Sequence, residues 1–214
     1  GIILAGGHSI DNPEPIFGLA VTGSVNISNL KRNDQAEVGS VLYLTKPLGI
    51  GILATAQKKG ILETVHKDIA ANSMTILNDV GIALAEIEEI TALTDVTGFG
   101  LLGHLLEMCE GSNVSAEINY SKVPIFEEIN GYLDQKCIPG GTLRNWGSYG
   151  HKVTLEDEKK RHILCDPQTS GGLLIAVKKE ASQKVAAILK SKGLFAAPIG
   201  TLVEKSASPV YIND

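Results

Sequence analysis

The chain has 214 residues, of which 43% are hydrophobic and 20% are charged, and its formal net charge is −5. This composition excludes an intrinsically disordered chain, and the length allows one large domain or two unequal ones. Because no dense basic run occurs, a general nucleic-acid-binding surface is not expected. The apolar runs are shorter than the ~20 residues that cross a bilayer, so no membrane partner is expected.

The 3 cysteines and 5 histidines are scattered along the chain. No C-x-x-C pair and no H-E-x-x-H motif occurs, so neither structural zinc nor a disulfide framework is expected. The lack of a signal-like segment favours the reducing cytoplasm. Cys165 is interpreted as a structural thiol, because no activating partner adjoins it in the sequence.

The chain opens in an apolar run, residues 1–5, without an initiator Met or a turn residue before it. A strand with no local partner is not stable by itself. We therefore expect that sequence has been removed upstream, although natural processing would give the same start.

Apolar periodicity and turn residues predict the following elements in chain order. The expected strands are 2–5, 16–25, 41–45, 90–96, 116–120, 173–177 and 199–203. The expected helices are 50–59, 72–85, 101–110 and 180–192. Residues 26–39 are predicted to be a polar linker, and the Gly-rich residues 139–150 a long loop that is functional or mobile. Because helices and strands alternate without strict βαβ regularity, we expect an α+β fold with a mixed β-sheet and flanking helices.

The strongest candidate site is TDVTGFG, at residues 94–100, directly after a predicted strand. A carboxylate at the carboxyl end of a strand, followed by glycines that open a helix, is a recurrent ligand geometry. The glycines let the backbone approach a phosphate, and the helix start offers free N–H groups. Asp95 would then hold a hard cation such as Mg²⁺. The structural alternative is an N-cap in a tight turn.

Two further segments could cradle phosphate through backbone amides: residues 6–9 (GGHS) and residues 166–172 (DPQTSGG). For each of them, a plain turn beside a strand is the alternative. In the second segment, Thr169, Ser170 and the two glycines are the candidates for this contact, and their individual roles stay open.

Four single residues have both a structural and a functional interpretation. His104 lies on the predicted helix face and is interpreted as a structural histidine rather than a base. Lys46 is expected to be a solvated lysine rather than a phosphate ligand. Arg144 and Asn145, in the predicted loop, are open candidates for contact with an anion.

Five segments together resemble the selenophosphate synthetases (selenide, water dikinases). They are GGHSIDNPEPIFGLAVTG, LTKPLGIGIL, LTDVTGFGLLGHL, PGGT-RN and LCDPQTSGGLL, in the order of that family from residue 1 to about residue 204. The same superfamily includes aminoimidazole ribonucleotide synthetase, thiamine-monophosphate kinase and a hydrogenase maturation protein.

The resemblance implies that selenide, ATP and water become selenophosphate, phosphate and AMP, with Mg²⁺ required. Selenophosphate supplies selenium for selenocysteine and for selenium-modified tRNA. The implied enzyme is a cytoplasmic homodimer. In it, Asp95 corresponds to a metal ligand, and Gly7, His8 and Ser9 correspond to a segment that contacts ATP bound mainly by the other subunit.

The resemblance also implies a domain division. Residues 1–34 would be the tail of an amino-terminal ATP-binding domain. Residues 35–214 would form a carboxyl-terminal domain like that of aminoimidazole ribonucleotide synthetase.

The family pattern includes amino-terminal parts that these residues lack: a Cys or selenocysteine, a Lys and further metal-binding aspartates. No catalytic residue is therefore assigned in this chain, which resembles the carboxyl-terminal two-thirds of the enzyme. Because one carboxylate is too few to hold several Mg²⁺ ions between phosphates, the chain alone is expected to be inactive.

Two alternatives remain open from the sequence. One is another ATP-dependent enzyme of the superfamily, of the aminoimidazole ribonucleotide synthetase or thiamine-monophosphate kinase type. The other is a non-catalytic module that binds a nucleotide or a partner protein. Upstream sequence with a Cys or selenocysteine near a Lys would distinguish the first alternative from the selenium enzyme.

Overall fold

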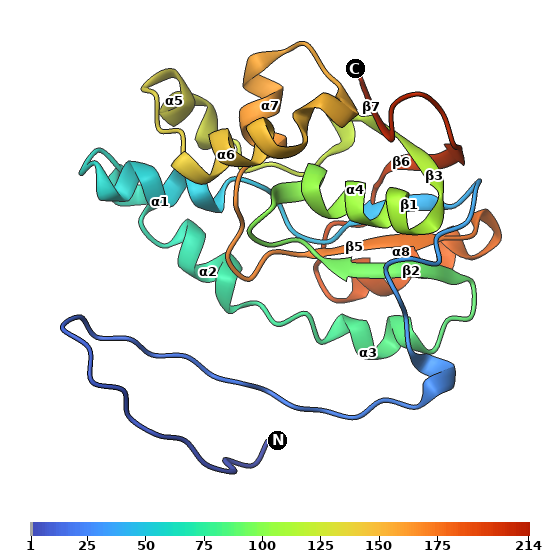
Figure 1. The fold of residues 1–214 in the computed structure, drawn as a ribbon, viewed down its shortest axis with the longest axis horizontal. Helices are drawn as coiled ribbons and strands as arrows, with labels where there is room; N and C mark the ends of the chain where they lie inside the picture. Colours follow the sequence, from blue (N-terminus) through green and yellow to red (C-terminus); the bar gives the residue numbers. More distant parts are fainter. Residues whose placement is uncertain (1) are drawn as a thin grey trace.

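The computed structural model describes residues 2–214, and its centre is a seven-stranded sheet (Figure 1). The strands lie in the order β2-β5-β1-β6-β3-β7-β4. β7 is parallel to its neighbours β3 and β4, and the other pairs are antiparallel, so the expected α+β fold with a mixed sheet is confirmed. The strand bounds are β1 Val41–Leu44, β2 Ile90–Asp95, β3 Val114–Asn119, β4 Val153–Thr154, β5 Leu173–Val177, β6 Pro198–Glu204 and β7 Val210–Asn213.

Helices cover both faces of the sheet, because the central strands bury side chains on both sides. β1 directs Leu42 and Leu44 into one core and Tyr43 into the other. The first core includes α1, α4, α5 and α7, and the second includes α3 and α8. The helix bounds are α1 Ile50–Lys58, α2 Ile69–Thr75, α3 Val80–Ala85, α4 Gly100–Ser112, α5 Ile129–Asp134, α6 Gly140–Tyr149, α7 Glu158–Leu164 and α8 Ser182–Ser191. Short 3₁₀ turns are η1 Ile27–Asn29, η2 Thr64–His66, η3 Tyr120–Lys122, η4 Gly150–Lys152 and η5 Lys179–Ala181.

The single helix expected at residues 72–85 is wrong, because the chain forms α2 and α3 with a break between them. Ile76 has extended backbone, with a ψ of 120°, and the side chain of Leu77 is exposed. The Lys46 ammonium donates to the carbonyl oxygen of Ile76 at 2.6 Å. A tertiary contact therefore takes a carbonyl that a continuous helix would use for its own hydrogen bond.

The loop expected at residues 139–150 is also wrong, because most of it is α6. Two glycines of this segment, Gly141 and Gly150, serve close packing rather than flexibility. A Cβ on Gly141 would lie 2.6 Å from Cγ of Pro167, and one on Gly150 would lie 2.5 Å from the Trp146 ring. Two of the glycines that suggested a loop are thus required by close contacts of the folded chain.

The strands expected at residues 2–5 and 16–25 are wrong. Both segments are exposed coil, and Figure 1 shows this part of the chain running apart from the sheet. Among the described residues no strand pairs with them, and an extended segment needs such a partner for its backbone N–H and C=O groups. Conversely, the short strands β4 and β7 were not expected. Gly1 lies outside the described residues.

The expected linker, residues 26–39, is coil apart from η1, but its second half packs against the domain. The Arg32 carbonyl accepts a hydrogen bond from the Leu93 N–H at 3.1 Å. Lys31 Nζ donates to the Ile87 carbonyl at 2.6 Å, and Ala36 is buried in the first core. The proposed boundary between residues 34 and 35 stays a prediction.

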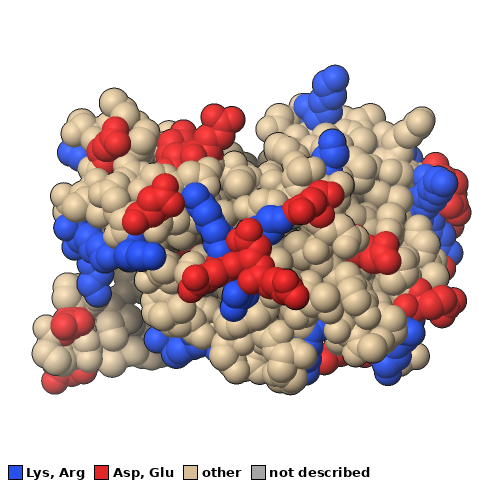
Figure 2. All heavy atoms as spheres, turned by 90° about the horizontal axis from the view of Figure 1, so that it is seen from above, with Lys and Arg blue, Asp and Glu red and all other residues tan. Residues whose placement is uncertain are grey.

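Acidic and basic side chains are interspersed over the face drawn in Figure 2, so this face carries no uniform basic patch. Within residues 2–214, no helix combines the length and the apolar character needed to cross a membrane.

We predict that removal of residues 1–25 leaves the free energy of unfolding unchanged within about 0.5 kcal/mol, because residues 2–25 are exposed. Removal of residues 1–34 should lower it by about 2 kcal/mol, since the hydrogen bonds of Lys31 and Arg32 are lost. Urea unfolding of the two deletion variants measures both values. Equal destabilisation by the two deletions would contradict this division of the linker.

Candidate functional site

The carboxylate singled out in the sequence stands at the exit of β2. Asp95 is the last residue of that strand and is exposed. The next residue, Val96, is buried and donates its N–H to the Gly172 carbonyl at 2.8 Å. α4 begins at Gly100, whose φ is 68° and whose Cα packs against the backbone of Cys165. A side chain at Gly100 would be strained and would collide, so this turn requires glycine.

The second Gly-rich segment, residues 166–172, packs directly on the turn after β2. The Gln168 N–H donates to the Thr97 carbonyl at 3.0 Å. A Cβ on Gly171 would lie 2.0 Å from the Val96 carbonyl oxygen, so only glycine permits this approach. Two motifs that are distant in the sequence therefore form one structural unit, which we call the turn junction (residues 95–100 and 165–172).

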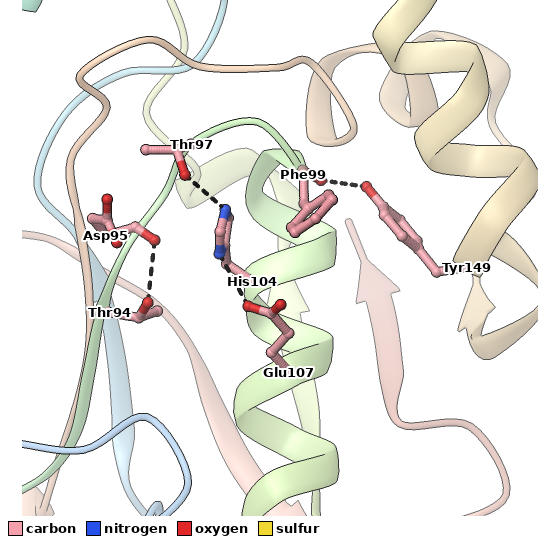
Figure 3. Close-up of polar contacts among 7 residues, drawn as sticks. All are labelled: Thr94, Asp95, Thr97, Phe99, His104, Glu107 and Tyr149. Carbon is pink, nitrogen blue, oxygen red and sulfur yellow. Dashed lines mark hydrogen bonds and ion pairs between the residues drawn. The ribbon is translucent and has the colours of Figure 1, made fainter. Parts of the chain in front are cut away.

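α6 holds the turn junction from a third side. Asn145 Nδ2 donates to the Gly98 carbonyl at 2.9 Å and to the Cys165 carbonyl at 3.1 Å. The Tyr149 hydroxyl donates to the Phe99 carbonyl at 2.5 Å, as Figure 3 shows. Asn145, left open as an anion contact, is thus used to join the two turns.

Asp166 fixes the junction to the start of α1. Its side chain is fully buried, and Oδ2 accepts hydrogen bonds from the Gly51 N–H and from Gln168 Nε2, both at 2.9 Å. Oδ1 is buried without a hydrogen-bond partner. Burial raises the pKa of the carboxyl to about 7, against the opposing effect of those hydrogen bonds.

Lys46, expected to be solvated, is buried, with an exposed fraction of 2%. Its ammonium donates to the carbonyls of Ile76 at 2.6 Å and Ser170 at 2.8 Å. Burial lowers the pKa of the ammonium group. The expectation was wrong because backbone carbonyls surround this ammonium group. By bonding to Ile76 and Ser170, Lys46 connects the end of α2 to the turn junction.

His104 lies on the first turns of α4, with both ring nitrogens hydrogen-bonded (Figure 3). Nε2 lies 3.2 Å from the Thr97 hydroxyl, and Nδ1 lies 3.2 Å from a carboxylate oxygen of Glu107. The ring is buried, as expected of a structural histidine.

Two hollows flank the turn junction. One of about 560 Å³ contains Asp95 and Thr94 and is walled by the linker residues 30–34. The other, of about 450 Å³, lies between α4 and α6, with Phe99 and Arg144 in its lining. The sequence did not indicate that the linker reaches the Asp95 site.

The donor set around Asp95 fits a Mg²⁺ ion only as part of a shared site. Within residues 2–214, no group of 3 or more His, Cys, Asp and Glu side chains is arranged to hold a metal. Mg²⁺ commonly keeps several waters and is held by one or two carboxylates together with phosphate oxygens. An exposed carboxylate at the mouth of a hollow suits that role.

The remaining candidates are not brought to Asp95. Gly7, His8 and Ser9 lie in the exposed amino-terminal coil. Thr169 is exposed, and the Ser170 hydroxyl donates to the Met74 carbonyl at 2.8 Å. Of the two Gly-rich segments predicted to cradle phosphate, residues 166–172 therefore lie at the Asp95 site, and residues 6–9 lie apart from it.

Sequence reasoning missed Glu107 and Tyr149, which shape the site, and it did not foresee the buried role of Asp166 within the segment 166–172. Glu107 could have been found, because it follows His104 by three positions and lies on the same helix face. Tyr149 has no local sequence signal, and the motif that contains Asp166 does not reveal the role of this carboxylate. Their roles depend on contacts with Phe99 and Gly51, which are distant in the sequence.

Comparison with protein families gives a match over residues 37–213 to the family described as AIR synthase related protein, C-terminal domain. Two similar curated proteins are both named selenide, water dikinase. The chain is 58% identical over 208 residues to that of Aeromonas hydrophila subsp. hydrophila, with 97% of this chain and 60% of the relative covered. It is 56% identical over 213 residues to that of Photorhabdus laumondii, covering 100% of this chain and 61% of the relative. The chain thus spans about three fifths of the length of these relatives.

Two solved structures share the fold at low sequence identity. Thiamine-monophosphate kinase from Stenotrophomonas maltophilia is 18% identical, with a TM-score of 0.61, covering 86% of this chain and 52% of that one. Hydrogenase maturation protein HypE, in complex with ATP, is 22% identical, with a TM-score of 0.61, covering 89% of this chain and 52% of that one. At these identities the likeness establishes the architecture of the sheet and helices.

We predict that Asp166 makes the free energy of unfolding fall as the pH rises from about 4 to about 7. The unfolded chain releases this proton near pH ~3.9, whereas the folded chain keeps it up to about pH 7. The folded state therefore binds more protons in this window, and its stability is lost as the pH rises.

Urea unfolding across this range, compared between the chain and Asp166→Asn, measures the effect. The difference between the two should change by up to ~1.4 kcal/mol per pH unit. Asp134→Asn, at an exposed carboxylate, serves as the control and should leave the slope unchanged. Parallel curves for Asp166→Asn and the unaltered chain would show that Asp166 titrates normally.

Proposed function

This chain belongs to the family of the AIR synthase related protein, C-terminal domain, and from that premise we propose that it serves in the ATP-dependent synthesis of selenophosphate. The proposed reaction converts selenide, ATP and water into selenophosphate, AMP and phosphate. The observation that carries the proposal is an identity of 52–58% with proteins named selenide, water dikinase, over 94–100% of this chain. The two solved structures share the fold alone, so they do not favour a thiamine-phosphate substrate.

The turn junction supports this chemistry on physical grounds. Phosphoryl transfer depends mainly on positioning and on neutralising charge at phosphate oxygens. Close glycine contacts and the bonds from Asn145 and Tyr149 hold the backbone after Asp95 in one conformation. A rigid strand exit that carries the exposed carboxylate of Asp95 is suited to orient a cation without moving during the reaction.

We propose that Asp95 is one ligand of a Mg²⁺ ion that also binds the phosphates of ATP. When bound, the ion would neutralise phosphate charge. Gly7, His8 and Ser9 are proposed to contact the nucleotide in a homodimer whose ATP site is completed across the interface. Their exposure in this chain leaves them free for such a contact. The cytoplasm is the proposed location.

The clearest test is Asp95→Ala in the natural protein that contains these residues. We expect kcat/KM for ATP to fall about 100-fold or more, because the cation would lose a charged ligand. Production of AMP in the presence of selenide measures the rate. Asp134→Ala, an exposed carboxylate paired only with Lys159 among the described residues, is the matched control and should stay within about twofold. Full turnover of the Asp95 variant would overturn the metal role.

The 214-residue chain alone is expected to produce no AMP above background. One carboxylate is insufficient for a site that usually needs two or more to hold ions between phosphates. The same assay, run on this chain and on the Aeromonas hydrophila relative, tests the point. Comparable rates would show that these residues are sufficient for catalysis.

A further inference from the structure

Three polar side chains form a hydrogen-bonded row across the start of α4 (Figure 3). The Glu107 carboxylate lies 3.2 Å from His104 Nδ1, and His104 Nε2 lies 3.2 Å from the Thr97 hydroxyl. His104 is only 7% exposed, whereas about half of the Glu107 side chain is exposed. The Phe99 ring lies 5.7 Å from the imidazole, centre to centre, and helps to enclose it.

The chemistry of these groups sets the direction of each hydrogen bond. An ionised carboxylate can only accept, so Nδ1 of His104 must carry the proton shared with Glu107. In the neutral ring, Nε2 is then a lone-pair acceptor. The hydroxyl of Thr97 must therefore donate its only proton to His104.

This direction has a consequence at the strand exit. With its proton engaged, Thr97 Oγ1 can offer only lone pairs to any further ligand. Thr97 stands two residues beyond Asp95, on the same turn. A hydroxyl in this state favours a hydrogen-bond donor, such as a water bound to a cation, and disfavours a phosphate oxygen, which can only accept.

We propose that His104 is a positioning residue: oriented by Glu107, it fixes the Thr97 hydroxyl as a lone-pair donor that binds a water of the Mg²⁺ ion proposed at Asp95. The proposal deepens the proposed function and rests on it. His104 does not touch the substrate or the ion, and it acts only through Thr97. A purely structural histidine would fill the same space without setting the direction of the hydroxyl.

The tautomer is tested first, without any activity measurement. In ¹⁵N NMR spectra of the 214-residue chain in mildly alkaline buffer, His104 should show a protonated Nδ1 and a lone-pair Nε2. The spectrum of His104→Leu identifies its signals among those of the 5 histidines. Thr97→Val should shift the Nε2 signal, and Thr97→Ser should not. A ring with its proton on Nε2 would overturn the proposal.

The second test measures the Mg²⁺ concentration that gives half-maximal AMP production by the natural protein. Thr97→Val and His104→Leu should each raise this concentration ~10-fold, the lower end of the effect of supporting residues around a metal. Thr97→Ser keeps the hydroxyl and should retain the native value. His104→Gln offers an amide oxygen as acceptor and should recover part of the loss.

The outcomes separate this inference from the proposed function. If Asp95→Ala raises the Mg²⁺ requirement and Thr97→Val does not, the inference is wrong and the Asp95 role stands. If Asp95→Ala has no effect, the metal role of Asp95 fails and this inference fails with it, whichever tautomer the NMR spectra show. Equal behaviour of His104→Gln and His104→Leu would show that the imidazole only fills space.

Discussion

The approach of two glycine-containing turns is the constraint on which the site depends. Gly171 lies against the Val96 carbonyl, and Gly100 lies against the backbone of Cys165, at distances that exclude any side chain. Interiors are close-packed and do not deform continuously, so these contacts allow one arrangement of the strand exit. Asp95 owes its fixed position to this backbone packing, because its own side chain is exposed and makes no part of the contact.

The sheet was largely predictable from the sequence, because its central strands read as short apolar runs. β1 and β5 are buried on both faces, and this produces the unbroken pattern at Leu42–Leu44 and Leu173–Val177. Residues 140–149 were not predictable as a helix, because the glycine at Gly141 is explained only by its close contact with Pro167, which is distant in the sequence. A packing contact with a distant residue leaves no pattern in the sequence around the glycine.

The candidate site likewise contains residues that the sequence could identify and residues that it could not. Asp95 and the glycines after it have a local signature, which the structure places at a strand exit followed by a helix. Asn145, Tyr149 and Asp166 act by bonding to backbone groups far away in the chain. Their chemistry follows from topology, so no pattern within a few residues of them could have identified it.

The hydrogen bond between the Arg32 carbonyl and the Leu93 amide also affects association between copies of this chain. β2 is one border of the sheet, and an uncovered border offers a template on which another chain can add a strand. The linker occupies the middle of that border, and at the opposite border β4 has only 2 residues. Addition of a strand from another copy is therefore disfavoured at both edges, because the linker bonds to Leu93 of β2 and because β4 is so short.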